Sequence, residues 1–382
     1  MSSRFMLRLA VALFLTLLTA ALSGPSAGVS GFMGAPGVAG PPDEARAGSV
    51  WVVNRDKGEL AVFDAGSGEV LAQMPVGAGA HDICISEHAG KAYVMAETIN
   101  SVTTVDTRTL ETEAIPVSPM PHHCEPSDDG RVVYVSLASH PTTPTPGISQ
   151  VAVIDTDDNS VSYLTSSTNP LARSHGPHPS HHGDTLYVAH DTGNAVTAID
   201  TETGAISAAA LTPNGGTITR AEEVVPTRVG HLLWASSRGD GTVKRIDLDA
   251  QAITDSVFIG ANQQSPAAVQ PESVLLTPSE RMLVASMRGT PAALAFVDTV
   301  KVALSGRVEI GGPGTFGDLA VMTPDGRFVY ATFDSLAGGT GGVAVVDVRT
   351  QKLVDVWAYP NTGRPHGIWY SRKTLHRLDD EP

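Results

Sequence analysis

The chain has 382 residues, a net charge of −15 and a hydrophobic content of 42%, enough apolar residues for a large core. Aromatic residues make up 5%, and 38 glycines and 26 prolines are typical of a turn-rich all-β protein. The negative charge would repel phosphate backbones, so we expect no nucleic-acid partner. The commonest motif-based chemistries have no support, since no phosphate-binding loop, C-x-x-C pair or H-E-x-x-H motif occurs.

The N-terminus has the pattern of an export signal. Arg4 and Arg8 flank the start of an apolar run over residues 9–22, which ends in small residues. We therefore predict a signal peptide over residues 1–23, export to the periplasm or the medium, and no membrane span after cleavage. A retained membrane anchor is the alternative. Residues 24–48 are rich in Gly, Pro and Ala without periodicity, which predicts a flexible leader.

From residue 49 onward, one unit recurs seven times: a β-branched or aromatic run, then a second run that ends in Asp, as in "LYVAHDTGNAVTAID". The closing aspartates lie 42 to 51 residues apart, a period that fits four short strands. We expect each of them to be a turn residue. They are Asp64, Asp106, Asp155, Asp200, Asp247, Asp298 and Asp347.

These units predict an all-β fold, a seven-bladed β-propeller of four-stranded antiparallel blades over residues 49–382. The last segment, "RPHGIWYSR", supplies the inner strand of a blade whose other strands lie at residues 50–74. The N- and C-terminal strands would thus share one blade and close the ring, which removes an exposed sheet edge.

The units resemble the bacterial YVTN-type seven-bladed propeller repeat over about residues 49–372. The specific matches are "PHGIWYS" at 365–371, "PHHCEPSDDGRVVYV" at 121–135 and "LYVAHDTGNAVTAIDTETG" at 186–204. The fifth and sixth units match loosely. The resemblance implies a fold and a binding surface, and no particular reaction, because functions in this family are diverse.

The family's units begin with "PHG", and counting back to that point in each unit identifies one residue per blade. In a propeller this position starts the innermost strand, so the seven side chains should surround one mouth of the axial channel. The fifth residue, Glu222, is assigned within one position. The set is His81, His122, His175, Glu222, Glu272, Asp318 and His366.

Four histidines on consecutive blades, with carboxylates on the other three, predict a transition-metal site that would take Cu, Zn or Fe. Three interpretations of the ring stay open. The histidines follow from family ancestry and bond water or backbone, they bind a metal, or they bind an organic or anionic ligand. In "SHGPHPSHHGD", only His175 belongs to the ring, while His178 lies further along the strand and His181 and His182 fall in a hairpin.

Cys84 and Cys124 lie in the inner strands of neighbouring blades, with opposite parity relative to the ring histidines. They could form a disulfide between blades in an oxidising compartment, remain buried thiols, or supply Cys124 as a soft metal ligand.

Three functions follow. The first is an exported binding module that holds a transition metal or small ligand at a channel mouth lined by His and carboxylates. The second is a lactonase-like hydrolase that uses the same mouth, and the third is a propeller that docks a protein partner without a ligand. We favour the first, because a ligand ring is visible and no nucleophile–base pair is.

Overall fold

The computed structural model describes residues 46–138, 149–169, 172–207, 217–260, 269–312, 314–335, 340–373 and 375. The predicted signal peptide and nearly all of the predicted leader lie outside these described residues. Within the described part, no helix has the length and apolar character needed to cross a membrane.

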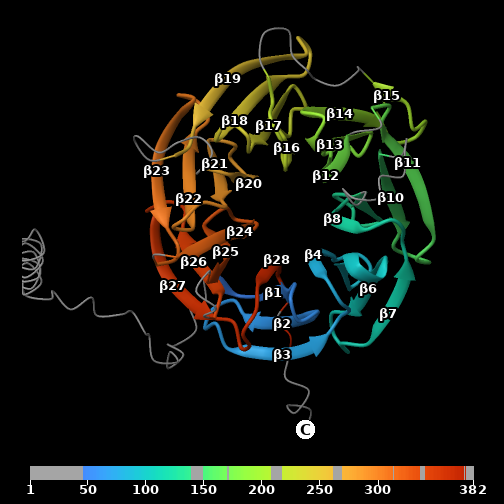
Figure 1. Cartoon of the computed structure of the whole chain (residues 1–382), viewed down its shortest axis with the longest axis vertical. Coiled ribbons are helices and arrows are strands. Elements are labelled where there is room, and N and C mark those ends of the chain that lie inside the picture. Colours follow the sequence, from blue (N-terminus) through green and yellow to red (C-terminus); the bar gives the residue numbers. More distant parts are fainter. Residues whose placement is uncertain are drawn as a thin grey trace, which may run out of the picture. The chain divides into compact units, whose positions relative to one another are not determined.

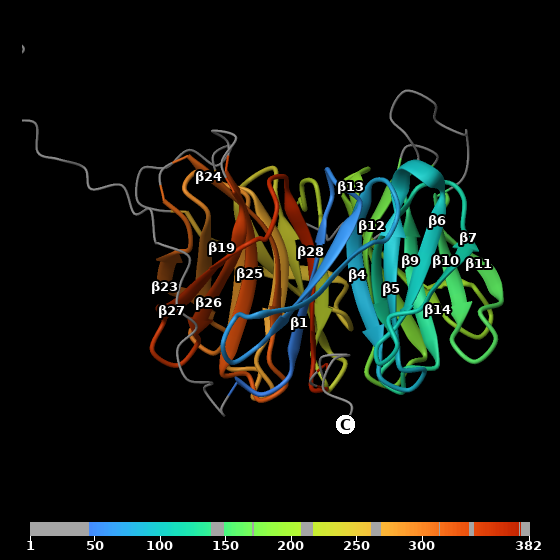
Figure 2. The same cartoon turned by 90° about the horizontal axis from the view of Figure 1, so that it is seen from below.

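Seven four-stranded antiparallel sheets surround a central axis, which confirms the predicted seven-bladed β-propeller (Figure 1). Seen from the side, the inner strands run along the length of the channel (Figure 2). Blade 1 pairs β28 with β1, β2 and β3, so the prediction that strands from both ends of the chain share the closing blade is also confirmed.

The strands of each blade follow in order from the axis to the outer rim. Blade 1 contains β28 (Pro365–Ser371), β1 (Ser49–Asn54), β2 (Glu59–Asp64) and β3 (Val70–Pro75). Blade 2 contains β4 (Ala80–Ser86), β5 (Lys91–Ala96), β6 (Ser101–Asp106) and β7 (Thr112–Pro116), with the short 3-10 helix η2 (Glu97–Ile99) after β5. Blade 3 contains β8 (Pro121–Pro126), β9 (Val132–Leu137), β10 (Ser149–Asp155) and β11 (Val161–Ser167).

The other four blades repeat this pattern. Blade 4 contains β12 (Arg173–Pro179), β13 (Thr185–Thr192), β14 (Ala195–Asp200) and β15 (Ile206–Ser207). Blade 5 contains β16 (Val224–Pro226), β17 (Leu232–Ser237), β18 (Thr242–Asp247) and β19 (Ala252–Phe258). Blade 6 contains β20 (Pro271–Leu276), β21 (Met282–Met287), β22 (Ala293–Asp298) and β23 (Ala303–Glu309). Blade 7 contains β24 (Thr315–Met322), β25 (Phe328–Ser335), β26 (Gly342–Asp347) and β27 (Lys352–Ala358).

The hydrophobic core lies between neighbouring blades. Val50 and Val52 of blade 1, for example, pack in one buried cluster with Tyr330 and Val345 of blade 7. The closing aspartates are turn residues, as predicted: the Asp64 carboxylate accepts hydrogen bonds from two backbone N–H groups of the turn after β2, at 3.0 and 2.7 Å. Buried valines thus hold the blades together, while the turns fix the length of each repeat.

The disulfide between Cys84 and Cys124 joins the inner strands of blades 2 and 3, with the two Cα atoms 6.0 Å apart. Of the three interpretations of these cysteines, the structure contains the inter-blade disulfide.

A β-bulge near the start of the inner strand decides which side chains reach the channel. The register of β4 shifts between Ala80 and Ile83, and similar shifts occur in β8, β12, β20, β24 and β28. In a regular strand, successive side chains point to opposite faces. The bulge breaks this alternation, so two consecutive residues of a bulged strand can face the axis.

Hydroxyl side chains on the second strand bond the backbone groups that the bulge removes from the ladder. Ser136 accepts the N–H of His123 at 3.0 Å, and Ser286 accepts the N–H of Ser273 at 3.0 Å. Ser236 does the same for Glu223 at 2.9 Å. A buried backbone group without a hydrogen-bond partner destabilises the fold, so these hydroxyls stabilise the irregular backbone in three of the blades.

Candidate functional site: an axial ring above a cavity

The seven predicted ring residues are all buried, and the structure brings them together around the axis. The four imidazoles form a continuous arc. The ring centroids of His366 and His81 lie 4.0 Å apart, as do those of His81 and His122. The centroids of His122 and His175 lie 4.6 Å apart. The counting that placed histidines of four consecutive blades at one mouth is therefore consistent with the structure.

The three acids complete the circle through arginines. His175 Nε2 lies 2.7 Å from Glu222 Oε2, so the structure places the residue chosen in the fifth unit next to the histidine arc. Arg238 Nη1 lies 2.7 Å from Glu222 Oε1 and 3.7 Å from Glu272 Oε2. Arg288 continues the arc with contacts of 3.4 Å to both Glu272 and Asp318. Each ring acid thus has a guanidinium beside it.

Asp318 contacts a second arginine and a ring histidine. Arg364, the residue before β28, lies 3.1 Å from its Oδ2 atom, and His366 Nε2 lies 3.2 Å from its Oδ1 atom. At Glu222, contacts of this kind change the pKa of the carboxyl group. Burial would raise the pKa of Glu222, but His175 and Arg238 outweigh it and hold the pKa below its ordinary value. At Asp318 burial outweighs the arginines, and the pKa of that carboxyl group is raised.

The surroundings of the histidine arc instead keep its side chains uncharged. Burial lowers the pKa of His81, His122 and His366 well below the usual value, and neighbouring charged groups lower it further. The imidazoles are therefore neutral near pH 7, which is the form that binds metals.

Contacts between blades fix the orientation of two of these rings. His81 Nδ1 lies 3.2 Å from the backbone oxygen of His122, and His175 Nδ1 lies 2.8 Å from that of Glu222. A carbonyl can only accept, so Nδ1 carries the proton in both rings; this leaves the lone pair of His81 on Nε2, whereas Nε2 of His175 faces the Glu222 carboxylate. A hydrogen bond of this kind is what orients a metal-binding histidine.

Several polar atoms around the histidine arc have no hydrogen-bond partner among the described residues. They include Nδ1 of His122, both ring nitrogens of His366, and Oε1 of Glu97, and one oxygen of each ring acid is in the same state. Buried polar atoms are seldom left in this state, so the cluster calls for a ligand or ion. It is the strongest structural sign of function in the molecule.

Glu97 is a site residue that the sequence reasoning missed. It follows β5, and its Oε1 atom lies 3.3 Å from His122 Nε2 and 3.8 Å from His81 Nε2. Its other oxygen accepts a 2.8 Å hydrogen bond from Arg55 Nη2. Burial raises the pKa of Glu97 in spite of Arg55.

The sequence does contain a signal for Glu97 and similar residues. In several units a charged residue stands at the end of the first run, which forms the second strand of the blade, and this pattern could have revealed them. Arg55, Glu97, Arg238 and Arg288 each follow directly after the second strand of their blade, and Asp191 lies near the end of β13. That end of the second strand lies beside the start of the first, so these side chains reach the ring.

A second tier lies one residue further along the inner strands. His123 Nδ1 is 3.2 Å from Asp82 Oδ2 and 3.2 Å from Glu223 Oε1. Burial would lower the pKa of His123, but the two carboxyl groups outweigh it and raise the pKa to about 9. Gly176 makes room for this cluster, because a Cβ atom at that position would lie 2.0 Å from Glu223 Oε2.

Three overlapping groups of buried side chains have ligand atoms within 4.8 Å of one another, so they could hold a metal ion. Among the described residues, Asp318, His366 and Glu97 belong to none of these groups. Glu222 and Glu272 belong to one group each. The groups are His81 with His122 and His123, His123 with His175 and Glu272, and His175 with Asp191 and Glu222.

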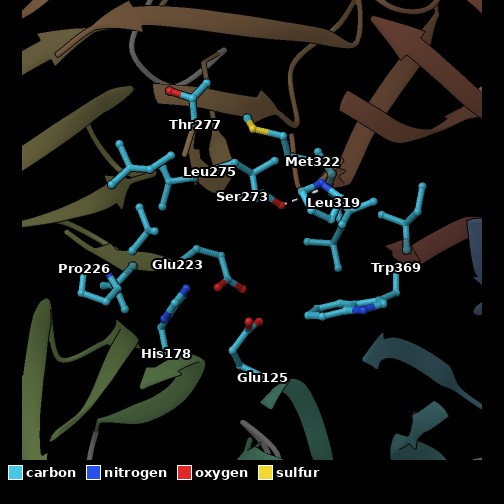
Figure 3. Close-up of a pocket in the computed structure, with 18 of the residues that line it drawn as sticks. Glu125, His178, Glu223, Pro226, Ser273, Leu275, Thr277, Leu319, Met322 and Trp369 are labelled. Carbon is cyan, nitrogen blue, oxygen red and sulfur yellow. Dashed lines mark hydrogen bonds between the residues drawn. The ribbon is translucent and has the colours of Figure 1, made fainter. Parts of the chain in front are cut away.

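The other histidines of "SHGPHPSHHGD" lie away from the ring. His181 and His182 fall in the turn between β12 and β13, as predicted. His178 and His181 line the cavity below the ring (Figure 3).

No model of a known protein family and no curated protein matches the chain. Solved structures do match. The chain is similar to dihydro-heme d1 dehydrogenase (14% identity, 85% of this chain and 75% of that chain, TM-score 0.61). It is also similar to Kuenenia stuttgartiensis hydrazine synthase (16%, 86% and 99%, TM-score 0.63) and to the periplasmic gluconolactonase of Pseudomonas aeruginosa (14%, 85% and 98%, TM-score 0.64).

At these identities the similarity shows the fold alone, a β-propeller shared by lactonase-like and heme-related proteins. The resemblance to the YVTN repeat family stays a prediction.

Proposed function

We propose that the protein is an exported β-propeller that binds a transition metal ion at the axial ring, through imidazoles of His81, His122, His175 and His366. The observation that carries the proposal is the cluster of buried nitrogen and oxygen atoms without partners around this arc. Neutral imidazoles suit Zn, Cu, Fe and Ni.

The geometry supports an asymmetric site within the ring. Glu97 Oε1 faces Nε2 of both His81 and His122, so these three residues offer two nitrogens and one oxygen to the same ion. The acids of the other arc are engaged by Arg238, Arg288 and Arg364, which favours a role for them in holding the ring together rather than in coordination. We therefore propose Glu97 as the carboxylate ligand.

Metal analysis of untagged protein tests this proposal. After incubation with Zn, Cu or Fe and removal of free metal, the wild type should retain one ion per chain. His122→Ala and His175→Ala should weaken binding by about tenfold or more. His231→Ala is the matched control, because His231 is an exposed histidine that contacts Asp249 on the surface. The proposal fails if the wild type retains no metal, or if His231→Ala weakens binding as much as His122→Ala.

Export is part of the proposal. The Cys84–Cys124 disulfide supports it, because disulfides persist mainly in oxidising compartments. Sequencing the N-terminus of protein from the periplasm or medium should find residue 24 first. A mature chain that begins at Met1 and stays in the cytoplasm would contradict it.

Lactone hydrolysis at the same mouth is the second candidate. It is favoured by the 3.3 Å contact of His122 Nε2 with Glu97 Oε1, since a carboxylate beside an imidazole can support a general base. Turnover of a lactone panel that Glu97→Gln abolishes, in chelator-treated protein, would favour hydrolysis over metal binding. Background rates for every lactone would leave the metal site as the function.

A further inference from the structure

The channel contains a cavity of about 430 Å³ on the inner side of the ring (Figure 3). Its lining extends from the second tier, at His123, to the turns after the inner strands, at Pro278 and Pro324. The inner strands begin at the ring, so the cavity occupies the rest of the channel and reaches towards the opposite face. Its volume lies in the range of pockets that hold small organic molecules.

One wall of the cavity is apolar. It is formed by strands β20, β24 and β28, and includes Leu275, Leu319, Met322 and Trp369. In Figure 3 the indole ring of Trp369 lies at the side of the cavity, across from the acidic side chains. Trp369 is partly exposed, so its ring is available for contact with a ligand. Aromatic faces attract cations as well as apolar groups.

The facing wall carries an excess of carboxyl groups. Glu125 of β8 and Glu223 before β16 point towards each other across the cavity (Figure 3). Glu223 and Asp82 share one cation, the His123 imidazole, at 3.2 Å each. Glu125 has no hydrogen bond or ion pair among the described residues. Three carboxyl groups therefore face one internal cation.

The basic residues of the lining do not correct this imbalance. Arg228 and Arg372 line the outer part of the cavity, and both side chains are exposed to solvent. Burial raises the pKa of Glu125 well above its usual value, and no cation lies beside its carboxyl group among the described residues. A cationic ligand would supply one.

We propose that this cavity binds an organic primary amine with an apolar body. The ammonium group would lie between Glu125 and Glu223, where its three N–H donors meet carboxylate oxygens. The body would pack against Leu275 and Leu319 and the face of Trp369. This site does not require a metal in the ring, so the proposal is independent of the proposed function.

Three probes of one shape and different charge test the proposal: 3-phenylpropylamine, 3-phenylpropan-1-ol and 3-phenylpropionate. Calorimetry on the mature chain, treated with chelator, measures their affinities. We expect the amine to bind at least about tenfold more tightly than the alcohol, and the acid to bind weakest. Equal affinity for amine and alcohol, tightest binding of the acid, or no binding of any probe at millimolar concentration would overturn the proposal.

Two variants locate the binding site. Glu125→Gln keeps the shape of the side chain and should weaken amine binding about tenfold, while leaving alcohol binding unchanged. Trp369→Leu should weaken amine binding by about three- to thirtyfold. Thermal unfolding of both variants checks that they are folded, and Glu111→Gln, in an exposed turn, is the matched control and should bind as the wild type does.

A requirement for metal separates this site from the ring. If the amine binds only to metal-loaded protein, and Glu125→Gln binds it as well as the wild type, the amine is a ligand of the ring metal and the cavity proposal is wrong. If chelated protein binds the amine and retains no metal under any condition, the cavity proposal stands while the proposed function fails.

Discussion

The ring and the cavity are made from the same seven inner strands, yet they treat acidic side chains in opposite ways. In the ring, Glu222, Glu272 and Asp318 are almost fully buried, and each contacts an arginine. In the cavity, Glu125 has no such partner among the described residues. The ring acids therefore stabilise the fold through their arginines, whereas Glu125 is available to a ligand.

The same contrast holds for the imidazoles. His123 has two carboxyl groups at its Nδ1 atom and is a cation, whereas His366 is a neutral ring whose nitrogens lack hydrogen bonds among the described residues. Unpaired groups in a folded protein cost stability, so their presence in two adjacent places of one channel indicates function.

The largest predicted effect tests the claim that the ring acids are structural. Arg238→Met removes the cation beside Glu222, whose side chain is 0% exposed. We expect a loss of about 3–5 kcal/mol in the free energy of unfolding, because a buried carboxylate loses its closest guanidinium. Denaturant unfolding monitored by circular dichroism measures it.

The matched control is Arg131→Met, since Arg131 contacts Asp157 on the surface at 3.2 Å. That change should cost less than about 1 kcal/mol. In addition, the double variant with Glu222→Gln should recover part of the loss. Equal losses for the two arginines would show that the ring ion pairs contribute no more than surface pairs do.

The next effect concerns the disulfide at the boundary between ring and cavity. Replacing Cys84 and Cys124 with alanine opens a loop with a sequence separation of 40 residues. We expect a loss of about 3–4 kcal/mol from the unfolded-state entropy of a loop of that size. Reduced wild-type protein should show a similar loss in denaturant unfolding, and a difference under about 1 kcal/mol in both would contradict the expectation.

The sequence was sufficient to predict the repeat, the shared blade and the ring, because each depends on spacing along the chain. The second tier was beyond it. Strict alternation along a strand places His123 on the opposite side from its ring neighbour His122, and the bulge in β8 turns both residues to the axis. Glu97 lies outside the strands, so a count from "PHG" does not reach it.

The pairing of charges was equally hidden. Glu272 and Arg288 are 16 residues apart and meet because the two strands between them form a hairpin, whereas Arg364 and Asp318 meet across neighbouring blades. Glu125 and Trp369 lie far apart in the sequence, and their common cavity depends on closure of the ring. Residue types alone could not separate a paired acid from an unpaired one.

A smaller effect of opposite sign is expected in the cavity. Glu125→Gln should increase the free energy of unfolding by about 1 kcal/mol near neutral pH. The native carboxyl group loses contact with water on folding and gains no partner that compensates the loss. Thermal and denaturant unfolding of the metal-free protein measure the gain. Glu111→Gln, in an exposed turn, should change stability by less than about 0.5 kcal/mol.

The pH dependence of that gain provides a further check. Burial raises the pKa of Glu125 above 4.5, so its contribution to stability is present at acid pH and is lost as the pH rises. The gain in Glu125→Gln should therefore be larger at about pH 8 than at about pH 5. A gain that shrinks with rising pH would mean that Glu125 is paired as an anion.

The smallest effect should come from Gly176→Ala. The added Cβ would lie 2.0 Å from Glu223 Oε2, the end of a flexible side chain that can move away, so the cost in stability should be under about 1 kcal/mol. The displaced Glu223 would stabilise the His123 cation less. The pKa of His123, followed by NMR, should fall below about 9 yet stay above 6.5, because the hydrogen bond to Asp82 persists. Gly312→Ala, where a Cβ meets nothing within 4 Å, is the control, and an equal His123 titration in both variants would mean that Glu223 does not hold the imidazolium.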